Sequence, residues 1–229
     1  MSSFSTEIID GHIIVQINNL KYLIDTGSPV SFGNGGPISI NGSKFEIPCT
    51  FFGLTIEKIN QLSGLSVHGL IGMSILKQFD LYFTNTETMF TSLSSMSYSK
   101  EALIFPIIET IANTPAIYMK IGDENHLMYF DTGAKLSYLH EALLQRHISF
   151  GEVNDFHPSI GNYTVPVYKV RVNIGEKQED LVFGRLPSSL SYCLDIPKVK
   201  GILGTEPLKN YSIILSNSTK KLIFEPNEL

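Results

Sequence analysis

The sequence predicts an all-β protein of two similar lobes related by pseudo-two-fold symmetry, with few short helices. Three observations support this fold class. A set of motifs occurs twice, most segments are short and rich in β-branched or aromatic residues between turn residues, and a serine-rich stretch separates the two copies. The 229 residues are enough for one large domain or two small ones.

The duplication consists of two pairs of motifs. "YLIDTGSPVSF" (22–32) and "MYFDTGAKLSY" (128–138) each place Asp-Thr-Gly directly after an apolar run. "GLIGMSILKQFDLYF" (69–83) and "GILGTEPLKNYSIIL" (201–215) form the second pair. Each copy therefore has the same order: a hairpin, Asp-Thr-Gly, a variable stretch, then two apolar residues and a glycine.

The serine-rich stretch divides the chain. We expect an N-terminal lobe at 1–91, a connector at 92–102 ("SLSSMSYSKEA") and a C-terminal lobe at 103–229. The clearest helix is predicted for 139–147, "LHEALLQRH", which has good helix formers and no Gly or Pro.

Composition argues against several classes of function. The net charge of −5 comes without any cluster of Lys and Arg, which disfavours nucleic-acid binding. No apolar run approaches the roughly 20 residues of a membrane span. The first residues have no basic leader, no long apolar segment and no length to spare for a propeptide, so we expect a cytoplasmic protein. With both lobes in one chain, we also expect a monomer.

The paired acidic residues carry the chemistry. A lone Asp-x-Gly after a strand is usually a turn, but two in a repeat are expected to meet at the axis between the lobes. Asp25 and Asp131 would then share one proton and activate a water molecule for hydrolysis. Gly27 and Gly133 permit the tight turns, and the hydroxyls of Thr26 and Thr132 can bond across the lobe interface.

On these residues the chain resembles single-chain aspartic peptidases of the pepsin and retropepsin type. The resemblance rests on Asp25-Thr26-Gly27-Ser28, Asp131-Thr132-Gly133-Ala134, and the downstream Leu70-Ile71-Gly72 and Ile202-Leu203-Gly204. It implies that both Asp residues are catalytic, that the threonines grip the two lobes together, and that Ile71, Gly72, Leu203 and Gly204 buttress the Asp loops.

The resemblance implies an aspartic endopeptidase that binds an extended peptide or protein substrate and uses no cofactor or metal. Two alternatives stay open: a catalytically weak or inactive peptide-binding module on the same fold, and a highly selective processing protease. A zinc helix is disfavoured because Leu144 stands where a second ligand four residues after His140 is needed. A serine hydrolase is disfavoured because Ser31 and Ser137 lack a Gly-x-Ser-x-Gly context.

The segment that covers the cleft is predicted to depart from the pepsin pattern. The stretch between Asp25 and Gly72 leaves little room for a flap, and the hairpin at Asn41-Gly42 is interpreted as an ordinary lobe hairpin. We therefore predict a single flap from the C-terminal lobe, with its tip near Ile160 and Gly161, followed by Asn162 and Tyr163. Tyr163 is either the flap aromatic or a strand residue packed on its own lobe.

The residues after the two glycines differ. The hydroxyl of Ser28 can hydrogen-bond to Asp25 and favour its ionised form, whereas Ala134 offers nothing to Asp131. We therefore predict that Asp131 more often holds the shared proton.

Overall fold

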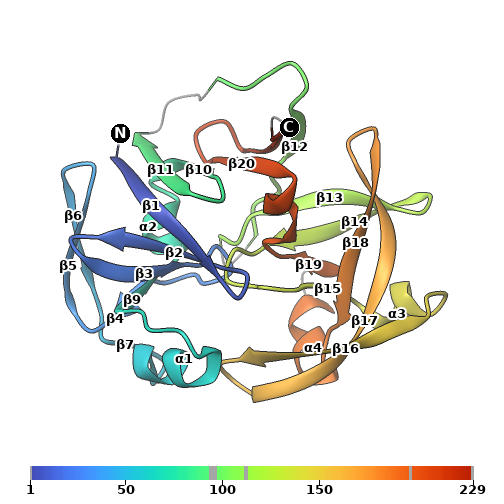
Figure 1. The fold of residues 1–229 in the computed structure, drawn as a ribbon, viewed down its shortest axis with the longest axis horizontal. Helices are drawn as coiled ribbons and strands as arrows, with labels where there is room; N and C mark the ends of the chain where they lie inside the picture. The colour runs from blue at the N-terminus through green and yellow to red at the C-terminus, as the bar shows by residue number, and fades with distance from the viewer. Residues whose placement is uncertain (1, 93–96, 111–112, 196–197, 228–229) are drawn as a thin grey trace.

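The computed structural model describes residues 2–92, 97–110, 113–195 and 198–227. Residues 93–96 of the predicted connector thus lie outside the described part. Strands dominate, and a large sheet runs through the middle of the molecule (Figure 1). Its ten strands, in spatial order, are β12 (Leu103–Pro106), β21 (Lys221–Pro226), β20 (Tyr211–Ser216), β10 (Phe79–Phe83), β11 (Glu87–Ser92), β1 (Ser2–Ile9), β2 (His12–Ile17), β3 (Leu20–Ile24), β9 (Gly69–Ile71) and β4 (Phe32–Gly33).

A second sheet belongs to the later part of the chain. Its seven strands, in spatial order, are β13 (Ala116–Ile121), β14 (Glu124–Phe130), β19 (Gly201–Leu203), β15 (Ser137–Leu139), β18 (Lys177–Arg185), β17 (Gly161–Ile174) and β16 (Ser149–His157). Two small hairpins complete the strands: β5 (Gly36–Ile40) with β6 (Ser43–Ile47), and β7 (Thr50–Phe51) with β8 (Leu54–Thr55).

The two-fold relation is visible in the strand order. In the large sheet, β12-β21-β20 mirrors β1-β11-β10, and the two sets join where β20 pairs with β10. Farther out, β3 runs parallel to β9, which is antiparallel to β4, and β14, β19 and β15 repeat that arrangement. The duplicated sequence motifs therefore form duplicated sheet corners.

Short helices connect these strands. They are α1 (Ile56–Ser63), α2 (Met73–Leu76), α3 (Glu141–Leu144), α4 (Ser188–Asp195) and the 3₁₀ helix η1 (Glu206–Lys209). The helix predicted for 139–147 is present only as the four-residue α3: Leu139 belongs to strand β15, and residues 145–147 form a turn and a bend. Sequence reasoning missed α1, although Thr55 caps it by accepting the N–H of Lys58 and Gly64 ends it with φ = +74°. Among the described residues, no helix is long and apolar enough to cross a membrane.

Tight turns with both central residues at positive φ link several strands. Asn41-Gly42 (φ 53° and 78°) joins β5 to β6, as expected for a type I′ turn. Phe52-Gly53 (φ 49° and 78°) joins β7 to β8, and a phenylalanine is unusual in this conformation. The core consists of alternate residues of the facing strands, including the fully buried Ile24 and Phe130 directly before the Asp loops.

Candidate active site

Each predicted Asp residue follows a buried strand. Strand β3 ends at Ile24 and β14 ends at Phe130, so Asp25 and Asp131 begin equivalent loops. The N–H of Asp25 donates to the carbonyl of Ile71 at 3.0 Å, and the N–H of Asp131 donates to that of Leu203 at 2.9 Å. The neighbouring parallel strand therefore fixes where each loop starts.

The glycines of the downstream motifs, Gly72 and Gly204, pack closely against the backbone of the same loops. A Cβ atom on Gly72 would lie 2.4 Å from the carbonyl oxygen of Val30, and one on Gly204 would lie 2.5 Å from that of Ala134. Glycine is needed for this close approach. The N–H groups of Gly72 and Gly204 donate to the hydroxyls of Ser31 and Ser137, both at 3.0 Å.

Ser31 and Ser137 were thus missed as supporting residues. Each lies six positions after its Asp, and that repeated offset was the signal that could have identified them. They are buried and bond to the backbone, which agrees with their rejection as nucleophiles.

The two threonines link the loops across the interface. The hydroxyl of Thr132 accepts the N–H of Thr26 at 3.0 Å and donates to the carbonyl of Ile24 at 2.9 Å. The hydroxyl of Thr26 accepts the N–H of Thr132 at 2.9 Å and donates to the carbonyl of Phe130 at 2.8 Å. Both threonines have no exposed surface. These four reciprocal hydrogen bonds hold the Asp loops in a fixed relation.

The carboxyl groups face each other across this junction. A Cβ atom on Gly27 would lie 2.3 Å from Oδ2 of Asp131, and one on Gly133 would lie 2.5 Å from Cγ of Asp25. Each carboxyl therefore lies directly against the glycine of the other loop. Asp131 accepts the N–H of Gly27 at 3.2 Å and that of Gly133 at 2.8 Å, while Asp25 accepts the N–H of Ser28 at 2.8 Å.

Burial and mutual repulsion change the acidity of the pair. Burial raises the pKa of both carboxyls, and the charge of Asp131 raises the pKa of Asp25 further, to well above its ordinary value. Backbone N–H groups oppose the rise, and the two bonds to Asp131 favour its ionised form. With two N–H bonds to Asp131 and one to Asp25, the backbone favours the shared proton on Asp25.

This assignment reverses the expectation from the sequence. The hydroxyl of Ser28 does not reach Asp25 but donates to the carbonyl of Val30 at 2.8 Å. The predicted bond from the Ser28 hydroxyl to Asp25 was therefore wrong, and in this loop Ser28 contributes its backbone N–H to Asp25 instead.

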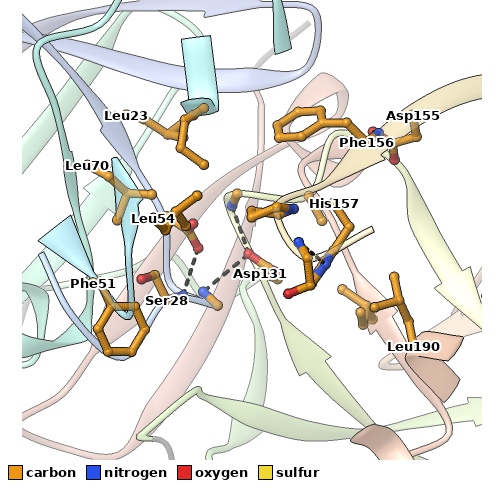
Figure 2. Close-up of a pocket in the computed structure, with 18 of the residues that line it drawn as sticks. Leu23, Ser28, Phe51, Leu54, Leu70, Asp131, Asp155, Phe156, His157 and Leu190 are labelled. Carbon is orange, nitrogen blue, oxygen red and sulfur yellow. Dashed lines mark hydrogen bonds between the residues drawn. The ribbon is translucent and has the colours of Figure 1, made fainter. Parts of the chain in front are cut away.

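A cavity of about 290 Å³ opens above the carboxyls. Figure 2 shows Leu23, Phe51 and Leu54 on one side of Asp131, and Phe156, His157 and Leu190 on the other. The first set comes from β3, β7 and β8, and the second from β16 and α4. Apart from the acidic pair, the cavity is mainly apolar, as expected for a binding cleft.

The hairpin β16–β17 covers this cavity. Its strands reach from the second sheet toward α1 of the first half (Figure 1). The turn lies between His157 and Gly161, which form the last strand pair. Of the four residues predicted for the flap, only Tyr163 lines the cavity with the Asp pair; Asn162 lines a neighbouring one, and Ile160 is 39% exposed.

The residues of β16 contribute more than expected because β16 is the outermost strand of its sheet and faces the other half of the molecule. Asp155, Phe156 and His157, together with Pro158 and Ser159 of the turn, line the cavity and were missed. Nothing in the sequence pattern marked which strand of the hairpin would lie at the edge.

A buried hydrogen-bond cluster holds this hairpin near its turn, where Asp155 pairs with Tyr163. The hydroxyl of Tyr138 donates to Asp155 and lies 3.1 Å from the hydroxyl of Tyr163. Asp155 also accepts the N–H of Phe156 at 2.8 Å. Burial raises the pKa of Tyr163 to about 12 and that of Tyr138 even higher, so both remain protonated donors.

Comparisons with known proteins bear on the fold. No protein-family model and no curated protein sequence matches the chain. Among solved structures, an aspartic proteinase from Irpex lacteus has a TM-score of 0.57 and 11% identity, covering 99% of this chain and 97% of that chain. The basic 7S globulin from soybean has a TM-score of 0.54 and 10% identity, covering 99% and 95%.

The predicted fold class is therefore confirmed: the chain has the mostly β, bilobal fold of pepsin-like aspartic proteinases. One of these neighbours is named as a proteinase and the other as a globulin. Because one fold can carry different functions, the activity has to be argued from the site.

Proposed function

We propose that the protein is an aspartic endopeptidase that hydrolyses peptide bonds with water activated between Asp25 and Asp131. The observation that carries the proposal is the reciprocal contact of the two carboxyls, each lying against the glycine of the opposite loop at the floor of an apolar cavity. Keeping two buried carboxyls together costs free energy, and a fold retains such an arrangement where chemistry needs it.

The two carboxyls would divide the acid and base roles. Ionised Asp131 removes a proton from the bound water as the oxygen attacks the peptide carbonyl carbon, and Asp25 donates its proton to the carbonyl oxygen. The resulting tetrahedral diol then collapses: the proton on Asp131 passes to the amide nitrogen, the C–N bond breaks, and Asp25 recovers a proton from a hydroxyl. The products are a carboxylic acid and an amine.

The cavity walls suit an extended peptide with apolar side chains. Such a chain satisfies its backbone through hydrogen bonds and places alternate side chains in pockets on opposite sides. The hairpin β16–β17 would act as the flap predicted for the C-terminal lobe and exclude bulk water during the reaction.

A peptide library tests the proposal directly. Wild-type protein is expected to cleave some members, and Asp25→Asn and Asp131→Asn are each expected to lower kcat/KM by at least about 10³-fold, because each removes one of the two proton-transfer groups. Circular dichroism of the variants checks that they fold. Cleavage by either variant at the wild-type rate would contradict the proposal.

A peptide-binding module without catalysis is the second candidate. The observation that favours it is the similarity of fold to a protein named as a globulin. Peptides would then bind to the wild type with measurable Kd and remain intact on prolonged incubation.

A further inference from the structure

The turn of the β16–β17 hairpin is closed by a side chain as well as by the backbone. The N–H of Ser159 donates to Nδ1 of His157 at 3.2 Å, and the N–H of Ile160 donates to the carbonyl of His157 at 3.1 Å. A side chain that accepts the N–H two residues later is the arrangement that Asn and Asp adopt in Asx turns. Here an imidazole takes that place at the edge of the cavity.

This bond determines where the imidazole proton lies. Nδ1 accepts a hydrogen bond, so in the neutral ring the proton is on Nε2. Among the described residues, none is hydrogen-bonded to Nε2 of His157. His157 is one of the residues that line the cavity containing Asp25 and Asp131, so its ring is close to where a bound peptide would lie.

Burial favours the neutral form of the ring. Burial lowers the pKa of His157, and the negative charge of Asp155 on the same strand opposes this only in part. The other titratable groups lining the cavity with His157 are Tyr163 from β17 and the pair Asp25 and Asp131 from the two loops. Since one proton is shared between the two carboxyls, the pair carries one negative charge, which acts in the same direction as Asp155 and against burial.

We infer that His157 is a substrate-positioning residue: its Nε2–H donates to a main-chain carbonyl of the bound peptide while its Nδ1 holds the turn. The inference rests on the peptide-binding part of the proposed function. The walls of the cavity are largely apolar, so peptide carbonyl groups that enter it need donors, and an unpaired carbonyl there would weaken binding.

Protonation of His157 would break the turn bond and leave the Nε2–H donor on a less fixed ring. Nδ1 would then carry a proton and oppose the N–H of Ser159, so that the turn loses its side-chain bond. Peptide binding is therefore expected to weaken as the pH falls below the pKa of His157, independently of the proton transfers at the Asp pair.

Two variants separate the roles of the ring nitrogens. In His157→Asn the side-chain oxygen can replace Nδ1 and keep the turn, but the Nε2 donor is lost. In His157→Gln the side-chain amide nitrogen can replace Nε2, but the turn acceptor is lost. Both are made on the Asp25→Asn background, where a peptide can bind without being cleaved.

The probe is a fluorescein-labelled octapeptide with Leu-Phe at its centre, and its Kd is measured by anisotropy between pH 4.5 and 7.5. At pH 7.5, His157→Asn is expected to raise Kd about 3- to 10-fold, and His157→Gln to raise it less. The increase in Kd toward acid pH should be present with His157 and absent in the Asn variant. Thermal unfolding of the Asn variant should match that of its parent.

Equal Kd values for the His157 and Asn proteins, equal losses in the Asn and Gln variants, or the same pH dependence in all three would overturn the inference. Absence of peptide binding to the Asp25→Asn parent would overturn it together with the peptide-binding part of the proposed function. The catalytic part fails separately, through cleavage of the library by Asp25→Asn at the wild-type rate.

Discussion

The two halves of the molecule have matching Asp loops but different hairpins beyond them. The N-terminal hairpin, β5–β6, is a separate two-stranded sheet whose Ile38 and Ile40 are buried in the core and whose Phe45 packs edge-on against Phe79. The C-terminal hairpin, β16–β17, extends a seven-stranded sheet and lines the cavity above the Asp pair.

This difference separates two tasks. The floor of the cavity needs two equivalent carboxyls held face to face, and the duplicated motifs supply equivalent loops, threonines and glycines. The roof of the cavity, formed by the hairpin β16–β17, has to cover one bound chain, and a single long hairpin is sufficient for that. Equivalent substitutions in the two Asp loops should therefore have similar effects, whereas substitutions in the hairpin β16–β17 have no counterpart in the N-terminal half.

The largest effect is expected at the glycines of the floor. Gly27→Ala and Gly133→Ala each place a methyl group within about 2.5 Å of the opposite carboxyl, so one loop has to move by roughly 1 Å. A displacement of that size at reacting groups costs on the order of 10²-fold in rate. Both variants should lower kcat/KM at least that much, by similar factors.

Gly151→Ala is the matched control for these variants. Gly151 lies in β16, and a Cβ atom there would meet only a side-chain methyl of Val167 at 4.0 Å. Its kinetics should equal those of the wild type. A loss of activity in only one of the two floor variants would show that the loops are not functionally equivalent.

The threonines test the same equivalence through stability. Thr26→Val and Thr132→Val each remove a hydroxyl that accepts one buried N–H and donates to one buried carbonyl. Leaving such groups unpaired costs about 1–3 kcal/mol each, so either variant should lower the free energy of unfolding by several kcal/mol in urea titrations.

Thr→Ser at the same positions retains the hydroxyl and should recover most of that loss. The double Val variant should cost less than the sum of the single variants, because both act on one network. Strict additivity would mean that the four bonds are independent and that the two loops are not joined through them.

The sequence predicted the floor well and the roof only in part. Asp25, Thr26 and Gly27 recur as Asp131, Thr132 and Gly133, so symmetry alone indicated that they meet. The hairpin of the C-terminal half was predicted, but which of its strands faces the cavity depends on its place at the sheet edge, which is a tertiary property. The orientation of the Ser28 hydroxyl likewise depends on the backbone geometry of the loop, which cannot be read from the amino-acid sequence.

Asp25→Asn is expected to have a smaller effect, and it should raise the stability of the folded protein rather than lower it. Because the pKa of Asp25 is raised in the folded state, the folded protein binds more protons than the unfolded chain between the ordinary value of 3.8 and the raised one. Wild-type stability therefore falls as the pH rises through that interval. The Asn variant cannot ionise, so its Tm should exceed that of the wild type at pH 7 and the difference should vanish below about pH 3.8.

Asp180→Asn provides the control with the opposite sign. Asp180 is bonded to Arg171 at 3.0 Å on the surface, which lowers the pKa of Asp180. Its replacement should leave Tm equal or slightly lower at pH 7, because exposed ion pairs contribute little. A Tm of Asp25→Asn below that of the wild type at pH 7 would contradict the raised pKa of Asp25 in the folded protein.

The smallest effect should come from one hydroxyl near the turn of the hairpin β16–β17. Tyr163→Phe removes the contact of 3.1 Å to the hydroxyl of Tyr138, while Tyr138 keeps its bond to Asp155. The hairpin thus loses one of two ties, and one neutral hydrogen bond is worth about 0.5–1.5 kcal/mol. KM should rise about 2- to 5-fold with kcat nearly unchanged, since the Asp pair is untouched.

Tyr118→Phe, at a 53% exposed position of β13, should leave both constants unchanged. If Tyr163→Phe lowered kcat rather than raising KM, the hydroxyl would act on the chemical step, and the separation between a catalytic floor and a binding roof would fail at this residue.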